Sequence, residues 1–485
     1  MKTVRIFSLI AILALVFALV PGASAGAPAG NWVSGIACQN LSTTDQATIT
    51  LYFYQEGSSS TAFPPYTDPN PIPPGGSRNY YTPSSPPGVP EGFLGSVVVA
   101  SDQPLACNVN TQTTGTGTSS DPYRMATSAG FADTQTAPTM YAPQVMKNLA
   151  GTWSSYIAVQ NTSNADVPVT VSYKDRNGNA LSANETATIK AQSNKVFYQT
   201  DNTNLVNGYV GAATIAADDG VSGLAVTVNF YNSGLSSDTA QFQSYNGFGG
   251  GANKLFVPRI VRNYYGYNGG LSIQNVGGSN ATVTITFNFA GNSYTYNSPS
   301  IAPGAALALY APNIAELNPV DGLNVTQRFG SAVIQASSGD SIVAIVNEDN
   351  RGGAGIPAER IGQGSTYNAI ADGSQTSTVF FPQVTRKAGI VFSGGFQVAN
   401  STSTAGTCSI KYNADTDANE SNVPLPANGS IARYAPNVAN LNDGYNASVS
   451  VECNREVLGI ANLAAEPGSG KLGDSATTAN GLNQQ

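Results

Sequence analysis

The sequence predicts an all-β chain built from four tandem antiparallel β-sandwich domains in an elongated array. One phrase recurs three times, as "YAPQVMKNLAGTWSSYIAVQN" from Tyr141, "FVPRIVRNYYGYNGGLSIQN" from Phe256 and "FFPQVTRKAGIVFSGGFQVAN" from Phe380. Short runs rich in Val, Ile, Thr and Tyr alternate with period two, and Gly and Pro punctuate them. No stretch shows helical periodicity, so the pattern favours strands throughout.

Each repeat has the same order of expected elements. A first strand ends in an anchor that recurs about every 120 residues, a period that suits an array of whole domains. The anchors are Gln39-Asn40, Gln160-Asn161, Gln274-Asn275 and the degenerate Ala399-Asn400. An alternating run, a polar turn, a strand ending in Tyr, a "GYVGAATIAA"-type strand and a closing strand ending in Asn then follow. About seven strands in about a hundred residues is typical of an antiparallel sandwich.

These landmarks divide the chain into a leader and four repeats. The predicted divisions are 1–25 for a signal peptide, 26–139 for repeat 1, 140–253 for repeat 2, 254–378 for repeat 3, and 379–485 for repeat 4 with a short polar tail.

The first 25 residues have the features of a secretory signal peptide. Lys2 and Arg5 precede an apolar run, and Ala23-Ser24-Ala25 is a small-residue cleavage site. The run is short for a membrane anchor, which is the alternative. We expect the mature chain to begin at Gly26, to be secreted or held at the cell surface, and not to insert into a membrane.

The repeat pattern resembles a family of tandem immunoglobulin-like repeats in secreted and surface proteins of bacteria. The resemblance rests on the aromatic-Pro-Gln/Arg segments, the strands ending in "QN", the "GYVGAATI"-type strands and "SYNGF" (Ser244 to Phe248). It covers nearly all of the mature chain. It implies extracellular scaffolding and no enzymatic activity.

The amino-acid composition argues against several classes of function. The 485-residue chain has no histidine, which excludes Ser-His and Cys-His nucleophiles, imidazole metal sites and histidine general bases. Its net charge of −8 disfavours a nucleic-acid partner, because such proteins carry a basic surface.

The four cysteines replace core residues inside the two terminal repeats. Cys38 aligns with Val159 and Cys107 with Val226, whereas Cys408 and Cys453 take inward positions of repeat 4. Four cysteines allow three pairings, and the alignment favours Cys38–Cys107 and Cys408–Cys453 in an exported chain.

Two loops have calcium-like spacing. Asp415, Asp417 and Asn419 alternate in "NADTDANE", and Asp175, Asn177 and Asn179 alternate in "KDRNGN". Both loops lie where every repeat has a hairpin turn, and turns favour Asp, Asn and Gly for backbone reasons. We expect turns rather than sites; calcium at Asp415, Asp417 and Asn419 is the one cofactor that the sequence offers.

Two further candidates concern carbohydrate. Glu348, Asp349 and Glu359 have the side-chain type of a glycosidase pair, although they follow a closing strand where polar residues are expected anyway. The Tyr- and Asn-rich "RNYYGYNGG" (Arg262 to Gly270) could bind sugars, but we favour a loop that packs against the adjoining repeat. No catalytic residue is assigned.

The recurring phrase is expected to be a junction, since four domains need three of them. Pro143, Pro258 and Pro382 suit an edge strand, and the basic residues Lys147, Arg262 and Lys387 suit a solvated face. If each segment is the first strand of the domain that follows it, repeat 1 lacks that strand. If each segment instead completes the domain that precedes it, repeat 4 lacks its last strand. The open edge could then pair head-to-tail with another copy.

The expected function is therefore that of a secreted, non-catalytic structural or adhesive protein of the cell surface, the extracellular matrix or a filament. Its expected partners are itself or surface and matrix components. An extracellular polysaccharide-binding protein is the alternative, and a glycoside hydrolase is the third possibility.

Overall fold

The computed structural model describes residues 10–17, 28, 30–82, 84–234, 236–337, 339–389 and 391–483 of the chain. The side chains of residues 10–17 are not described. The cleavage site at Ala23 to Ala25 lies outside these residues. Among the described residues, strands dominate and the only helices are short 3-10 turns. The all-β prediction is confirmed, and the described part contains no helix of the length and apolarity needed to cross a membrane.

Repeat 1 forms two sheets around an apolar core that includes Ile36, Leu51, Phe53 and Val97. One sheet has the order β4-β3-β6-β1-β9 and the other β33-β8-β7-β2-β5. Its strands are β1 (Ile10–Phe17), β2 (Trp32–Asn40), β3 (Ile49–Gln55), β4 (Tyr66–Thr67), β5 (Ser77–Tyr81), β6 (Leu94–Ser101), β7 (Leu105–Thr113), β8 (Tyr123–Ala129) and β9 (Phe131–Ala132).

Repeat 2 packs sheet β10-β15-β12-β13 on sheet β14-β11-β16-β17. Alternate residues of β12, such as Val167, Val169 and Val171, are fully buried between them, as the period-two pattern predicts. Its strands are β10 (Thr139–Lys147), β11 (Trp153–Asn161), β12 (Val167–Asp175), β13 (Glu185–Ile189), β14 (Asn194–Tyr198), β15 (Tyr209–Ala217), β16 (Leu224–Asn232) and β17 (Phe242–Asn246).

Repeat 3 has the sheets β21-β20-β23-β18-β26 and β22-β19-β24-β25. Its strands are β18 (Lys254–Val261), β19 (Tyr267–Asn275), β20 (Val283–Phe289), β21 (Asn292–Asn297), β22 (Ala306–Tyr310), β23 (Phe329–Ala336), β24 (Ile342–Asn350), β25 (Gly364–Asn368) and β26 (Ile370–Ala371).

In repeat 4 the 20-residue strand β32 joins both layers, so all but the short β33 form one eight-stranded sheet. Its strands are β27 (Thr376–Thr385), β28 (Phe392–Asn400), β29 (Gly406–Tyr412), β30 (Glu420–Leu425), β31 (Ser430–Tyr434), β32 (Asn446–Ala465), β33 (Gly473–Asp474), β34 (Ala476–Asn480) and β35 (Leu482–Asn483). The 3-10 turns of the chain are η1 (Asp133–Gln135), η2 (Ala311–Asn313), η3 (Ala315–Gly322), η4 (Val325–Gln327), η5 (Ala358–Arg360), η6 (Thr416–Ala418) and η7 (Ala435–Asn437).

The recurring phrase supplies the first strand of the repeat that follows it. β10 pairs with β15, β18 with β23 and β27 with β32, each within its own repeat. The register of each pair shifts around its proline, because proline cannot donate to the ladder and is accommodated at a bulge. In repeat 1 the equivalent place, beside β6, is taken by β1, which pairs with all eight residues of that strand.

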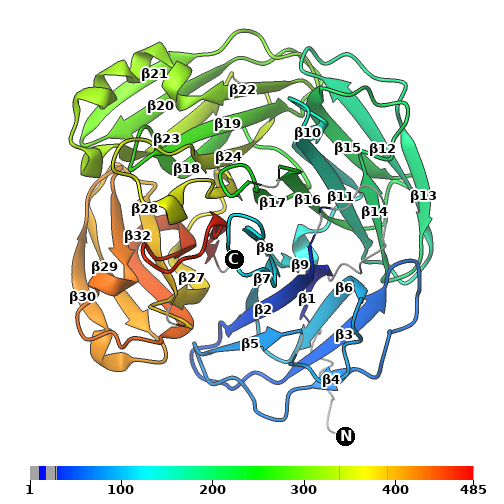
Figure 1. Ribbon diagram of the computed structural model, residues 1–485, viewed down its shortest axis with the longest axis horizontal. Helices are drawn as coiled ribbons and strands as arrows, with labels where there is room; N and C mark the ends of the chain where they lie inside the picture. Colours follow the sequence, from blue (N-terminus) through cyan, green and yellow to red (C-terminus); the bar gives the residue numbers. More distant parts are fainter. Residues whose placement is uncertain are drawn as a thin grey trace, which may run out of the picture.

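The four repeats close into a ring, and the expectation of an elongated array is wrong (Figure 1). Repeat 4, orange in the figure, lies beside repeat 1, which is blue. Gln39 Nε2 donates to Ser450 Oγ at 2.9 Å, and the Ser448 amide donates to Ser77 Oγ at 2.9 Å. Ser448 Oγ also donates to Gly75 O, as Ser96 Oγ donates to Gln192 O between repeats 1 and 2, so the same kind of contact joins consecutive repeats and the last repeat to the first.

The last long strands of the repeats (β8, β17, β25 and β34) meet at the centre of the ring, where asparagine side chains link them. Asn246 Nδ2 donates to Ala129 O, Asn368 Nδ2 to Asn246 O, and Asn480 Nδ2 to Asn368 O, at 2.6 to 2.8 Å. The amides of Asn246 and Asn368 in turn donate to the Oδ1 atoms of Asn368 and Asn480. The "YNGF"-type motif thus marks the ring centre, and repeat 1 has Ala129 in its place.

Asp474 of repeat 4 is fully buried at the ring centre and contacts each of the other three repeats. Its carboxylate accepts hydrogen bonds from the amides of Phe242 in repeat 2 (2.9 Å) and Gly364 in repeat 3 (2.6 Å). Its strand, β33, pairs in parallel with β8 of repeat 1 at Arg124. Burial raises the pKa of Asp474 well above its usual value, against the opposing effect of these amides and of Arg124.

The disulfides and the basic residues complete the fold. Cys38–Cys107 and Cys408–Cys453 form disulfides, each between adjacent strands of one terminal repeat.

Lys147 and Arg262 are buried, so the prediction that they lie on a solvated face is wrong. Lys147 Nζ donates to Asn202 O at 2.6 Å, and the Arg262 guanidinium donates to Ala311 O and to Asp321, so both residues fix connections inside their own repeats.

Candidate functional site

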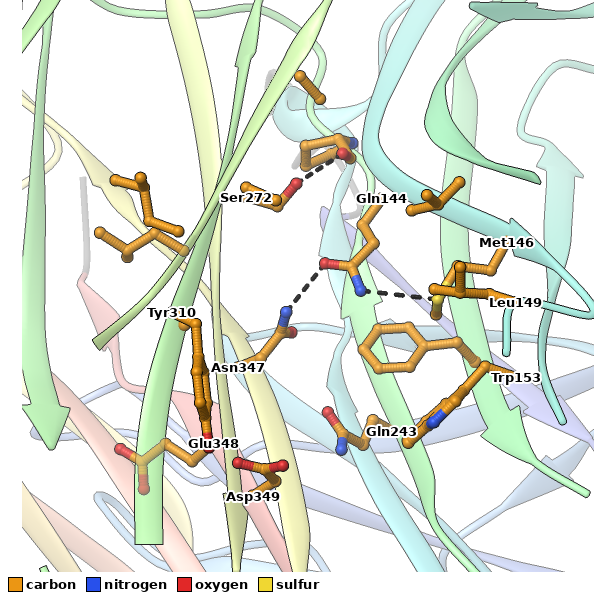
Figure 2. A pocket seen from close by; sticks show the side chains of 18 of the residues that line it. Gln144, Met146, Leu149, Trp153, Gln243, Ser272, Tyr310, Asn347, Glu348 and Asp349 are labelled. Atoms are coloured by element: carbon orange, nitrogen blue, oxygen red, sulfur yellow. Dashed lines mark hydrogen bonds between the residues drawn. The ribbon is translucent and has the colours of Figure 1, made fainter. Parts of the chain in front are cut away.

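A cavity of about 310 Å³ lies between repeats 2 and 3. Strands β10, β11, β15, β16 and β17 supply the repeat 2 side, and β19, β22 and β24 supply the repeat 3 side. Figure 2 shows Trp153 and Met146 on one side of the space and Tyr310 on the other, with Gln144 and Asn347 between them.

Small side chains on repeat 3 create this space. Gly270 and Ser272 of β19 lie opposite Tyr310 and Ala308 of β22. Counted back from the "QN" anchor, the residues of repeat 2 that correspond to Gly270 and Ser272 are Tyr156 and Ala158, paired with Tyr198 and Val196. The Tyr156 ring fills the corresponding junction between repeats 1 and 2, where it packs with Trp32, Val196 and Phe242. The cavity therefore results from a local loss of side-chain volume at one junction.

Aromatic side chains form the two ends of the apolar lining. Trp153 packs beside Phe230 with ring centroids 6.1 Å apart, and both line the cavity from repeat 2. Tyr310 lines it from repeat 3, and the Arg351 guanidinium lies 5.1 Å from the Tyr310 ring centroid. Trp153 and Tyr310 are half-buried, so each keeps surface that a ligand could cover.

Amide side chains cross the cavity as one network. Asn347 Nδ2 donates to Gln144 Oε1 at 2.9 Å, which joins repeat 3 to repeat 2. The Thr366 hydroxyl lies 2.8 Å from Asn347 Oδ1 and 2.6 Å from Gln243 Oε1. Gln144 Nε2 has the sulfur of Met146 as its hydrogen-bond partner, at 3.9 Å, which is a weak acceptor. The network orients polar groups within an otherwise apolar space.

The structure brings two of the three glycosidase candidates to this cavity. The single N–H of Arg259 Nε is shared by the two carboxylate oxygens of Glu348, at 2.9 and 3.2 Å, and Asp349 accepts a hydrogen bond from Arg351 Nε at 2.5 Å. Burial raises the pKa of Asp349, and the contacts with Arg351 and Tyr310 oppose that rise. Glu359 lies elsewhere and accepts hydrogen bonds from the amides of Gly468 and Gly470. Each carboxylate at the cavity thus has an arginine partner.

Two of the calcium candidates, Asp415 and Asn419, have hydrogen-bond partners within the chain. Asp415 Oδ2 accepts hydrogen bonds from the amide and side chain of Asn442, whereas Asn419 Oδ1 accepts one from the Tyr412 amide. Asp175 accepts bonds from Asn177 and Asn179, which closes its own turn. Within the described part of the chain, no three acidic or cysteine side chains are grouped as metal ligands.

The "RNYYGYNGG" segment packs mainly on its own repeat, not on the adjoining one as expected. Tyr264 contacts Phe329, and Tyr267 donates a hydrogen bond to Gln363 Oε1, both within repeat 3. Of the polar side chains in this segment, Asn268 lines the cavity.

Comparisons with known proteins assign no family. No family model and no curated protein matches the chain. A solved structure titled Thermotoga maritima 1070 aligns with 25% of this chain and 96% of its own, at 20% identity and a TM-score of 0.19. The serine-rich repeat adhesion glycoprotein Srr1 from Streptococcus agalactiae covers 56% of this chain and 89% of its own, at 9% identity and a TM-score of 0.12. Likenesses this weak carry no functional argument.

Sequence reasoning missed Trp153, Tyr310 and the small residues that open the cavity. Trp153 lies inside the recurring phrase, which we interpreted as architecture only. An alignment of the four repeats already contains the signal, since Gly270 and Ala308 stand where repeat 2 has Tyr156 and Val196.

Proposed function

We propose that the chain is a secreted, non-catalytic adhesive protein of the cell surface or extracellular matrix, built from four immunoglobulin-like domains. The observation that carries the proposal is the cavity between repeats 2 and 3. Its apolar and aromatic lining with a few oriented amides is the composition of a recognition site. Such a site supports holding a partner.

The state of the carboxylates favours binding over hydrolysis. A glycosidase needs one protonated acid and one free carboxylate on either side of the scissile bond. Glu348 and Asp349 are adjacent in sequence on β24, and each is paired with an arginine. Both carboxylates are held by arginine side chains, so neither is the free carboxylate that hydrolysis requires, although burial raises the pKa of Asp349.

The leader and the disulfides support an extracellular location. Disulfides persist in oxidising compartments, and both lie in the core of their repeats. Fractionation of the producing cells, with N-terminal sequencing of the product, tests this part. A product found only in the cytoplasm, with free thiols, contradicts it.

Adhesion is tested with the purified full-length chain. Immobilised protein should retain cells or matrix material of the producing organism, and it should release no product from a panel of chromogenic glycosides. Turnover of any glycoside that is lost in Glu348→Gln would contradict the non-catalytic part of the proposal. Failure to retain any surface material would contradict the adhesive part.

A further inference from the structure

We infer that the cavity between repeats 2 and 3 binds one uncharged pyranose ring of an extracellular glycan, with the ring held between Trp153 and Tyr310. This inference rests on the proposed function and names the partner's chemistry. It follows from the size of the space, from its aromatic ends and from the state of its polar groups.

The first step is size and shape. About 310 Å³ is at the lower end of the range for small-ligand pockets, which is roughly 300–1,000 Å³, so the space suits a single ring rather than an extended chain. Trp153 and Tyr310 lie on opposite sides of it (Figure 2). The face of an aromatic ring is electron-rich and attracts the polarised C–H groups on the face of a pyranose.

The second step is hydrogen bonding. The hydroxyl groups of a sugar need both donors and acceptors, and amide side chains provide both. Among the described residues, Gln144 Nε2 has the weak Met146 sulfur as its acceptor, and Gln144 Oε1 accepts a hydrogen bond from Asn347 Nδ2 at 2.9 Å. Asn268 adds a second amide at the lining. A ligand hydroxyl is a better partner for Gln144 Nε2 than the Met146 sulfur.

The third step is charge. Glu348 and Asp349, the two acidic residues of the lining, are paired with Arg259 and Arg351. These two pairs leave the interior without a net charge. Arg176 is exposed at the rim and lies on the turn after β12. The interior therefore favours an uncharged ring, and a carboxylated sugar is the alternative that the experiment must separate.

The cavity can be filled without altering its aromatic or amide side chains. Ala308 is an exposed lining residue opposite Ser272, and Ala432 is its register equivalent in repeat 4, opposite Gln397. Ala308→Phe places a ring in the space, whereas Ala432→Phe makes the same change at another junction. Ala432→Phe is thus a matched control for any loss of stability that comes from placing a phenylalanine at this strand position.

The experiment measures dissociation constants by calorimetry for the full-length chain with neutral oligosaccharides, uronate oligosaccharides and phenylalanine- or leucine-rich peptides. We expect neutral glycans to bind, Ala308→Phe to abolish binding, and Trp153→Ala to weaken it at least tenfold. Ala432→Phe should bind like the unchanged protein. Thermal melting of each variant shows whether lost binding reflects lost folding, and Tyr310→Ala provides a second wall variant if Trp153→Ala unfolds.

Each other outcome overturns the inference. Binding of uronates alone, unaffected by Trp153→Ala but lost in Arg176→Gln, would place recognition on the rim. Selective binding of the peptides would show that the cavity accepts an apolar side chain of a protein partner and not a sugar ring. If Ala308→Phe retains surface material as well as the unchanged protein does, this inference is wrong and the proposed adhesion still stands. If neither the unchanged protein nor any variant retains surface material, both proposals are wrong.

Discussion

Asp474 makes the stability of the whole ring sensitive to pH. It is fully buried, and burial raises its pKa well above the unfolded value near 4. The folded state therefore holds a proton that the unfolded state releases, so the stabilising contribution is complete below about pH 4 and is lost as the pH rises towards the folded-state pKa. Stability should fall by up to about 1.4 kcal/mol per pH unit across that window.

Denaturant unfolding of the natural chain and of Asp474→Asn at a series of pH values checks this prediction. Asparagine has nearly the same shape and does not titrate, so the difference in unfolding free energy between the two proteins should change steadily with pH. A constant difference from pH 4 to pH 8 would show that the folded-state pKa of Asp474 is not raised.

Ala129 interrupts the asparagine links at the ring centre. In the other three repeats the corresponding residue is asparagine, and each neighbouring pair exchanges side-chain hydrogen bonds. Ala129→Asn should add a bond to Asn480 O and accept one from the Asn480 amide. At about 0.5–1.5 kcal/mol per bond, the gain in unfolding free energy should be about 1–3 kcal/mol.

Asn368→Ala is the matched loss, because it removes the donor to Asn246 O and the acceptor of the Asn246 amide. We expect it to destabilise the chain by about 1–3 kcal/mol. Opposite signs for the two variants in denaturant melts support the links as a stabilising set. A neutral effect of both would show that water replaces them at no cost.

The disulfides stabilise individual repeats. Cys38–Cys107 closes 69 residues of sequence and Cys408–Cys453 closes 45. In the chain-entropy model each should contribute about 4 kcal/mol. Mild reduction should therefore accelerate amide exchange in repeats 1 and 4 and leave the cores of repeats 2 and 3 protected. Equal acceleration in all four repeats would mean that the ring unfolds as one unit.

Strand β1, which pairs with β6, belongs to the predicted signal peptide. Its counterparts β10, β18 and β27 belong to the repeats themselves. If the product begins at Gly26, β1 is absent and β6 keeps only β3 as a long neighbour. Amides of β6 should then exchange faster than those of β15 and β23, which lie between two strands. Exchange mass spectrometry on the processed chain measures this, and equal protection of the three strands in a monomer would contradict it.

Much of the element order could be predicted from the sequence, because period-two alternation and turn residues are local signals. The anchors Asn40, Asn161, Asn275 and Asn400 each end a strand. The burial of Lys147 could not be predicted, since its partner Asn202 O lies in a loop whose path depends on the folded sheets. The cavity depends on side chains from two repeats that no local pattern brings together.

Ring closure was not predictable either, because it depends on contacts between residues about 370 positions apart, such as Ser77 and Ser448. A closed ring should be compact: for about 460 residues the radius of gyration of a globular chain is about 23 Å. Small-angle X-ray scattering should give a value near this one, and a markedly larger radius with an elongated distance distribution would favour the open array. Head-to-tail pairing between chains would compete for the surfaces that repeats 1 and 4 use on each other.

The contact between repeats 4 and 1 differs from the other three in one respect: no peptide connection crosses it. Asn110 Nδ2 donates to Gln383 Oε1 there as Asn347 Nδ2 donates to Gln144 Oε1 between repeats 3 and 2. The order of the repeats along the chain is therefore only one of several that would build the same molecule. A circular permutant that starts at repeat 3 and joins repeat 4 to repeat 1 through a flexible linker should fold to the same ring, and separately expressed halves should assemble into it by complementation.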